Sequence, residues 1–193
     1  ATAAALVFGK VFFPTADPFV STMASFGTFA AGFLARPLGG VVFGHLGDRV
    51  GRKKALMATL VIMGLATVGI GLLPSYASAG LWAPALLLLL RLAQGLAVGG
   101  EWGGAVLMAG EHASQRRRTF AASFAQLGSP AGLILSLLAF RLLTALDEAD
   151  FVSWGWRVPF LISALLLLVG YFIRIGVNES PDFAQVLERQ ERA

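Results

Sequence analysis

Residues 44–54 read Gly44-His-Leu-Gly-Asp-Arg-Val-Gly-Arg-Lys-Lys54, a short basic segment between two apolar runs at about 19–46 and 55–73. The hydrocarbon core of a bilayer is about 30 Å thick, and a helix needs about 20 residues to cross it. Both flanking runs are long enough. The segment is therefore predicted to be a loop between two membrane helices.

Four further apolar runs lie at about 1–13, 82–110, 119–143 and 158–176. The first is too short to span alone. It ends at Pro14 and Asp17-Pro18, because proline lacks a backbone donor and disfavours helix before it. We expect an all-α membrane protein with five complete spans and one truncated span, in which Arg36-Pro37 interrupts the run at 19–46. The polar residues 177–193 are expected to begin a cytoplasmic linker.

The composition agrees with a lipid environment. Of the 193 residues, 56% are hydrophobic and 13% are charged, and the mean hydropathy is +0.74. A soluble domain of this size needs a more polar surface; the alternative is a buried piece of a very large soluble protein. With no cysteine and two histidines, a disulfide framework and a thiolate metal site are excluded, and no cofactor or metal is expected.

The basic residues indicate the orientation. They gather at 49–54, at 116–118 and at Arg174, Arg189 and Arg192. These segments share one side of the membrane if the spans alternate, and an excess of lysine and arginine marks the cytoplasmic side. Of the opposite segments, 74–81 is uncharged and 147–150 is acidic. The chain is therefore expected in the cytoplasmic (inner) membrane, and its net charge of +4 does not indicate nucleic-acid binding.

Tryptophans fall at span ends on the predicted outer side, where an interfacial aromatic belt is expected. They are Trp82, Trp154 and Trp156.

The run at 82–110 carries polar side chains inside the membrane. At about 100° per residue, Arg91, Gln94, Glu101 and Trp102 share one stripe of a helix. A charge at the bilayer centre costs about 3 kcal/mol or more, so it normally faces a cavity or a partner. We expect the stripe to line a cavity that binds substrate or couples protons, with Arg36 as a weaker candidate. The alternative is a static ion pair that joins helices.

Glu101 is the candidate proton carrier. A carboxyl group is neutral and easily buried when protonated, whereas the ionised form needs Arg91, another cation or water. Guanidinium stays charged at any working pH and binds carboxylate through two hydrogen bonds. The arginines therefore favour a small carboxylate as substrate, with a zwitterion second.

Residues 44–54 resemble the signature segment of the major facilitator superfamily, G-x-L-x-D-R-x-G-R-R/K, at every defined position. Arg91-Leu-Ala-Gln-Gly95 is similar to its R-x-x-Q-G pattern. Glycines permit close packing and a tight reversal, and Asp48 can pair with arginines or with helix N-terminal donors. The resemblance implies a gating segment that latches the outward-facing state, formed by Gly44, Asp48, Arg49, Gly51, Arg52, Lys53 and Glu111.

Five further segments together resemble the metabolite:proton symporter family, which includes shikimate, α-ketoglutarate, citrate and proline/betaine transporters. They lie at 5–14, 35–40, 98–104, 154–160 and 179–183, and residues 99–111 are most similar to the shikimate branch. The resemblance implies a twelve-helix fold of two six-helix halves, each built from inverted three-helix repeats. This chain is then the N-terminal six-helix half with its first helix truncated, and the C-terminal half of the same transporter is its partner.

The expected function is proton-coupled symport of a small organic acid, such as a shikimate-like carboxylate, or of a zwitterionic osmolyte. The alternatives are another major facilitator uniporter or antiporter, a channel, and a membrane-embedded enzyme. An enzyme is disfavoured because the chain has no cysteine, no H-E-x-x-H and no aspartate cluster. An ATP-driven transporter is disfavoured because G-x-x-x-x-G-K-S/T is absent.

Overall fold

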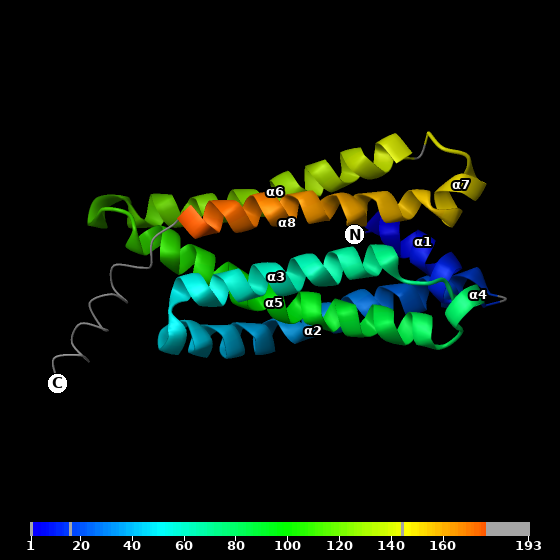
Figure 1. The fold of residues 1–193 in the computed structure, drawn as a ribbon, viewed down its shortest axis with the longest axis horizontal. Helices are drawn as coiled ribbons and strands as arrows, with labels where there is room; N and C mark the ends of the chain where they lie inside the picture. Colours follow the sequence, from blue (N-terminus) through cyan, green and yellow to red (C-terminus); the bar gives the residue numbers. More distant parts are fainter. Residues whose placement is uncertain (1, 16, 144, 177–193) are drawn as a thin grey trace.

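The computed structural model describes residues 2–15, 17–143 and 145–176 as a bundle of helices, with no strand in these ranges (Figure 1). The long elements are α1 (Thr2–Phe12), α2 (Pro18–Val50), α3 (Arg52–Leu72), α5 (Trp82–Glu111), α6 (Arg118–Leu143) and α8 (Val158–Gly176). Short ones connect them: α4 (Tyr76–Ala79), η1 (Gln115–Arg117), α7 (Glu148–Ser153) and η2 (Gly155–Arg157). The predicted linker at 177–193 lies outside the described residues.

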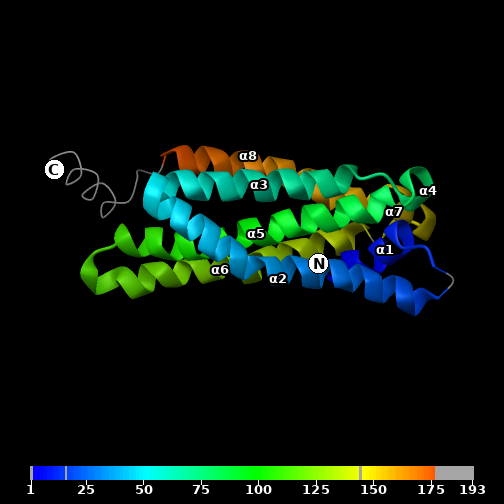
Figure 2. The same cartoon turned by 90° about the horizontal axis from the view of Figure 1, so that it is seen from below.

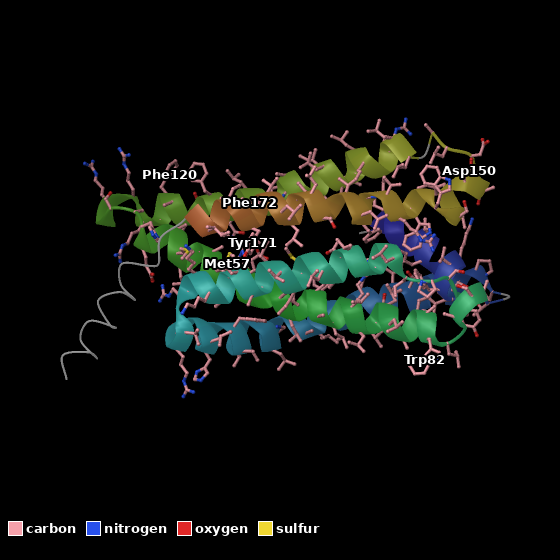
Figure 3. All side chains as sticks on the ribbon, in the orientation of Figure 1. Met57, Trp82, Phe120, Asp150, Tyr171 and Phe172 are labelled. Carbon is pink, nitrogen blue, oxygen red and sulfur yellow. The ribbon has the colours of Figure 1, made fainter. Side chains whose placement is uncertain are left out.

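Five helical segments in the described part are long and apolar enough to cross a membrane: α2, α3, α5, α6 and the stretch Gly155–Gly176. Large apolar side chains on the flanks of the bundle point away from it, among them Trp82, Phe120 and Phe172 (Figure 3). These side chains are 74%, 67% and 69% exposed, which suits a lipid environment. The predicted all-α membrane fold is confirmed.

The two ends of the bundle differ. The short helices α4 and α7 lie at one end, and the turn between α2 and α3 lies at the other with η1 (Figure 1). We refer to them as the α4 end and the Gly51 end.

The predicted loop at 44–54 is almost entirely helical, which corrects the sequence-based boundaries. Helix α2 continues to Val50 and α3 begins at Arg52, so only Gly51 separates them. Its φ of 110° is a conformation that side chains disfavour, and its N–H donates to the Gly47 carbonyl over 3.1 Å. Polar residues at a membrane surface can remain helical, so the end of the apolar run did not mark the end of the helix.

Helix α2 also passes through Pro37 without interruption, although the sequence suggested a break there. Its neighbour α5 approaches very closely at this level (Figure 2). A methyl group on Gly95 would lie 2.0 Å from the Gly32 carbonyl oxygen, and one on Gly99 would lie 2.0 Å from that of Arg36. Small residues allow this backbone contact, which is how membrane helices associate without a hydrophobic driving force.

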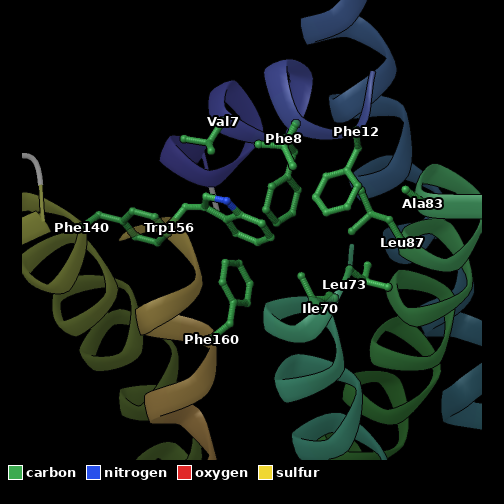
Figure 4. Packing of buried hydrophobic residues seen from close by; sticks show 11 residues of the cluster. Val7, Phe8, Phe12, Ile70, Leu73, Ala83, Leu87, Phe140, Trp156 and Phe160 are labelled. Carbon is green, nitrogen blue, oxygen red and sulfur yellow. The ribbon is translucent and has the colours of Figure 1, made fainter. Parts of the chain in front are cut away.

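An aromatic cluster closes the α4 end and joins α1 to η2 and α8 (Figure 4). The Trp156 ring centroid lies 5.5 Å from that of Phe8 and 5.7 Å from that of Phe12, both near perpendicular. Trp156 is fully buried, whereas Trp154 is 49% exposed. Trp156 therefore packs inside the bundle and does not face outward as Trp154 does, because a tryptophan at a span end also suits a buried cluster.

Candidate functional site

The core of the candidate site is a chain of hydrogen bonds between α5 and α3. Arg91 and Gln94 are three residues apart on α5, so their side chains are neighbours. The Arg91 Nη1 donates to Gln94 Oε1 over 2.9 Å. The Gln94 Nε2 then donates to Thr67 Oγ1 of α3 over 2.7 Å. The sequence predicted Arg91 and Gln94 but gave no sign of Thr67.

Aromatic rings surround the Arg91 guanidinium. Its central carbon lies 4.0 Å from the ring centroid of Phe29 in α2 and 5.3 Å from that of Phe8 in α1. Cation–π contacts of this kind stabilise a desolvated cation. They explain how the helix carries this charge although no ion pair of Arg91 is found in the described part of the chain.

A cavity of about 210 Å³ opens beside Arg91, between α2, α3 and α5. Arg36 also lines it and lies 3.7 Å from the ring centroid of Phe33. The described residues that line this cavity include two cations and no carboxylate: Phe29, Gly32, Phe33, Arg36, Met63, Thr67, Arg91, Gln94, Gly95 and Val98. The Nε atoms of Arg36 and Arg91 are buried and have no hydrogen-bond partner among the described residues.

Glu101 does not lie in this cavity, contrary to the predicted stripe. Its Oε1 accepts a hydrogen bond from Arg174 Nη2 of α8 over 2.5 Å. Arg174 also donates from Nη1 to the Leu56 carbonyl of α3. Both charged side chains are about one-fifth exposed, at 22% and 21%. Arg174 thus joins α3, α5 and α8, whereas the sequence suggested only a basic cytoplasmic residue.

Trp102 turns to a third side of α5. Its Nε1 donates to Gln126 Oε1 of α6 over 3.3 Å. Both line a wider cavity of about 600 Å³ between α2, α5 and α6, which Arg36 and Val98 share with the first cavity. The predicted site residues therefore fall into three groups. Arg36, Arg91 and Gln94 line one cavity, Trp102 lines a second cavity together with Arg36, and Glu101 lies apart.

The predicted gating segment forms part of the expected charge network. Arg52 pairs with Glu111, and both side chains are largely buried. Lys53 Nζ donates to the Ile175 carbonyl at the end of α8 over 2.8 Å. Asp48 is exposed, and no ion pair between it and Arg52 is found within the described residues. The network therefore contains Arg52 and Glu111 without Asp48.

The face of α2 around Asp48 is open. A methyl group on Gly44 would meet nothing within 4 Å among the described residues, so close packing there is not seen within this part of the chain. Arg49 is exposed as well. Asp48 and Arg52 line a cavity of about 200 Å³ between α2, α3 and α5.

Known proteins resemble the chain over its whole length. The inner membrane metabolite transport protein YhjE of Escherichia coli (strain K12) is 51% identical over 193 residues, which are 100% of this chain and 44% of that protein. The shikimate transporter of the same organism is 50% identical, covering 98% and 44%. The proline/betaine transporter of Salmonella typhimurium is 47% identical, covering 97% and 38%. The chain thus spans less than half the length of these relatives.

Solved structures share the fold. The partially occluded, inward-open xylose transporter XylE of E. coli superposes with a TM-score of 0.81 at 19% identity, covering 98% of this chain and 51% of that one. The curated relatives named above are all transport proteins. The family described as "Sugar (and other) transporter" matches residues 3–193. The chain belongs to this family of the major facilitator superfamily, as the sequence motifs predicted.

Proposed function

We propose that the chain forms the N-terminal half of a proton-coupled symporter for a small organic acid in the inner membrane. The observation that carries the proposal is the cavity lined by both Arg36 and Arg91, with no carboxylate among its described lining residues. One named relative is a shikimate transporter and another structural neighbour is a proton:xylose symporter. A zwitterionic osmolyte is the second candidate, since a further relative is a proline/betaine transporter.

The arginines support a carboxylate ligand. Each guanidinium keeps a buried Nε without a partner among the described residues, and an ionised oxygen would satisfy that donor. An arginine binds a carboxylate through two parallel hydrogen bonds, which gives direction as well as affinity. The 210 Å³ cavity accommodates a small acidic group, and the remainder of the solute would extend past Arg36 into the wider cavity.

Glu101 remains the proposed proton-linked carboxylate of this half, now with Arg174 as its partner. Protonation removes the negative charge and leaves Arg174 bonded to the Leu56 carbonyl. Breaking a buried pair by neutralising one member is costly, so the proton would weaken the connection that Arg174 makes between α5 and α8. Arg91 lies on the same helix, which provides a mechanical connection to the cavity. A static ion pair that joins these helices is the competing interpretation.

The latch is proposed to involve both halves of the transporter. The Arg52–Glu111 pair holds the Gly51 turn to α5. Gly44 and Asp48 are four residues apart on α2, so they lie on the same exposed face of this helix. The C-terminal half would pack on this face in the outward-facing state and release it as the halves rock. Paired charges with two discrete arrangements are a common device for such switching.

The orientation of the bundle is proposed from its charges, with the Gly51 end cytoplasmic. A single cysteine at Ser78, in α4, should react with an impermeant thiol reagent added outside the cell. Labelling of that cysteine only from the cytoplasmic side would reverse the orientation.

Uptake by the full-length transporter in proteoliposomes tests the function. Labelled shikimate should accumulate when the outside is made acidic and should only equilibrate without a pH gradient. Glycine betaine and a neutral polyol serve as competitors, and strong inhibition by the polyol alone would remove the carboxylate assignment. Accumulation that ignores the pH gradient would indicate a uniporter or another coupling ion.

A further inference from the structure

Thr67 occupies a decisive position in the hydrogen-bond chain although it belongs to none of the sequence motifs. It lies on α3 and lines the cavity with Arg91 and Gln94. Its hydroxyl donates to the Met63 carbonyl one turn earlier over 2.7 Å. The same oxygen accepts from Gln94 Nε2 over 2.7 Å.

The donor and acceptor roles along this chain of hydrogen bonds are fixed. A threonine hydroxyl has a single hydrogen, and Met63 already receives it. Thr67 can therefore offer Gln94 only a lone pair, and the amide must turn its NH₂ toward Thr67. Its carbonyl oxygen then faces Arg91, which needs an acceptor. With the amide reversed, two donors would face each other at Arg91 and two acceptors would face each other at Thr67.

The fixed amide in turn fixes the guanidinium. Arg91 Nη1 is tied to Gln94, and the ring of Phe29 lies against the guanidinium at 4.0 Å. This leaves the buried Nε as a donor without a partner among the described residues. We infer that Thr67 is a positioning residue: it sets the Gln94 amide so that Arg91 presents a fixed edge to the substrate carboxylate. This inference rests on the proposed function.

Valine removes the hydroxyl and keeps the branched shape of Thr67. In Thr67→Val the Gln94 amide loses the bond that holds it to α3, so its contact with Arg91 is no longer fixed, and KM for shikimate should rise about tenfold, the effect of losing a hydrogen bond to a charged group. The kcat should stay within about twofold, because the lost contact is made in the bound ground state as well. Thr67→Ser, which keeps the hydroxyl, should restore the wild-type KM.

A matched control exists on the same helix. Thr59 is fully buried. Its hydroxyl donates to the Leu56 carbonyl over 2.9 Å, and it has no side-chain partner among the described residues. That carbonyl keeps a second donor in Arg174. Thr59→Val should therefore leave the KM unchanged. A tenfold rise in both valine variants would mean that any lost hydroxyl loosens α3, and would overturn the positioning role.

A second measurement does not depend on transport. Phenylglyoxal modifies arginine, and mass spectrometry of the full-length transporter reports its reaction at Arg91. We expect the rate to rise several-fold in Thr67→Val and to stay unchanged in Thr67→Ser and Thr59→Val. An unaltered rate in Thr67→Val would refute the inference. If the wild type takes up no shikimate, the proposed function fails, and these rates still decide the role of Thr67.

Discussion

Two charged groups on one helix are stabilised in opposite ways. Arg91 lies among aromatic rings, an amide and a hydroxyl, and its cavity has no carboxylate among the described lining residues. Glu101, further along α5, is already neutralised by Arg174 at 2.5 Å. The first site keeps an excess charge that a ligand can compensate. The second is complete without a ligand and changes only when a proton or a movement breaks the pair.

The largest loss of transport is expected when Arg91 is changed. Arg91→Lys keeps the positive charge but loses the planar fork that binds carboxylate. We expect kcat/KM for shikimate to fall about a hundredfold, as for truncating one member of a buried charged pair. Uptake by equal amounts of reconstituted protein measures this, and Arg116→Lys, an exposed position in η1, is the control. Near-normal uptake by Arg91→Lys would show that the guanidinium does not hold the substrate.

The proposed proton-linked role of the Glu101–Arg174 pair is tested by Glu101→Gln, because glutamine resembles the protonated carboxyl group. It should retain exchange of labelled for unlabelled shikimate and lose accumulation driven by a pH gradient. Counterflow and uptake assays on the same preparation separate the two activities. If the variant still concentrates substrate, Glu101 is structural and the proton-linked group lies elsewhere.

A smaller loss is expected for Asp48→Asn on the open face of α2. Because asparagine keeps the shape but not the charge, the contact with the other half should weaken. We expect turnover to fall about tenfold, the scale of one charged contact, while the amount of protein at the membrane changes little. Undiminished transport would remove Asp48 from the latch.

The smallest effect is expected for an exposed reference pair. Lys10 and Glu148 also approach to 2.5 Å, but their side chains are 62% and 78% exposed. The Lys10 ammonium lowers the pKa of Glu148 through its hydrogen bond and its charge. A lowered carboxyl pKa stabilises the folded state above the unfolded pKa and loses this effect as the pH falls through the folded value.

Lys10→Met should therefore lower the Tm by about 2 °C or less at neutral pH. The difference from the wild type should vanish in acid, as thermal unfolding at both pH values will show. A large shift at neutral pH would mean that exposure is not what distinguishes this pair from Glu101–Arg174.

Local sequence patterns predicted what one helix determines by itself. The spans follow from long apolar runs, and Arg91 meets Gln94 because residues three apart share a helix face. The partners between helices could not be predicted in this way. Glu101 meets Arg174 because α5 and α8 both pack on α3. Thr67, in turn, looks like any threonine in an apolar helix. The burial of Trp156 likewise depends on neighbours from other helices, such as Phe8 of α1.

Only Gly51 separates α2 from α3, so the two helices are joined without a flexible loop. A tilt of α2 cannot be absorbed by slack in a loop, so it must turn the start of α3. There Arg52 holds Glu111 of α5, and Lys53 holds the Ile175 carbonyl at the end of α8. Motion of the α2–α3 turn would therefore reach the last turn of α8 through these two contacts.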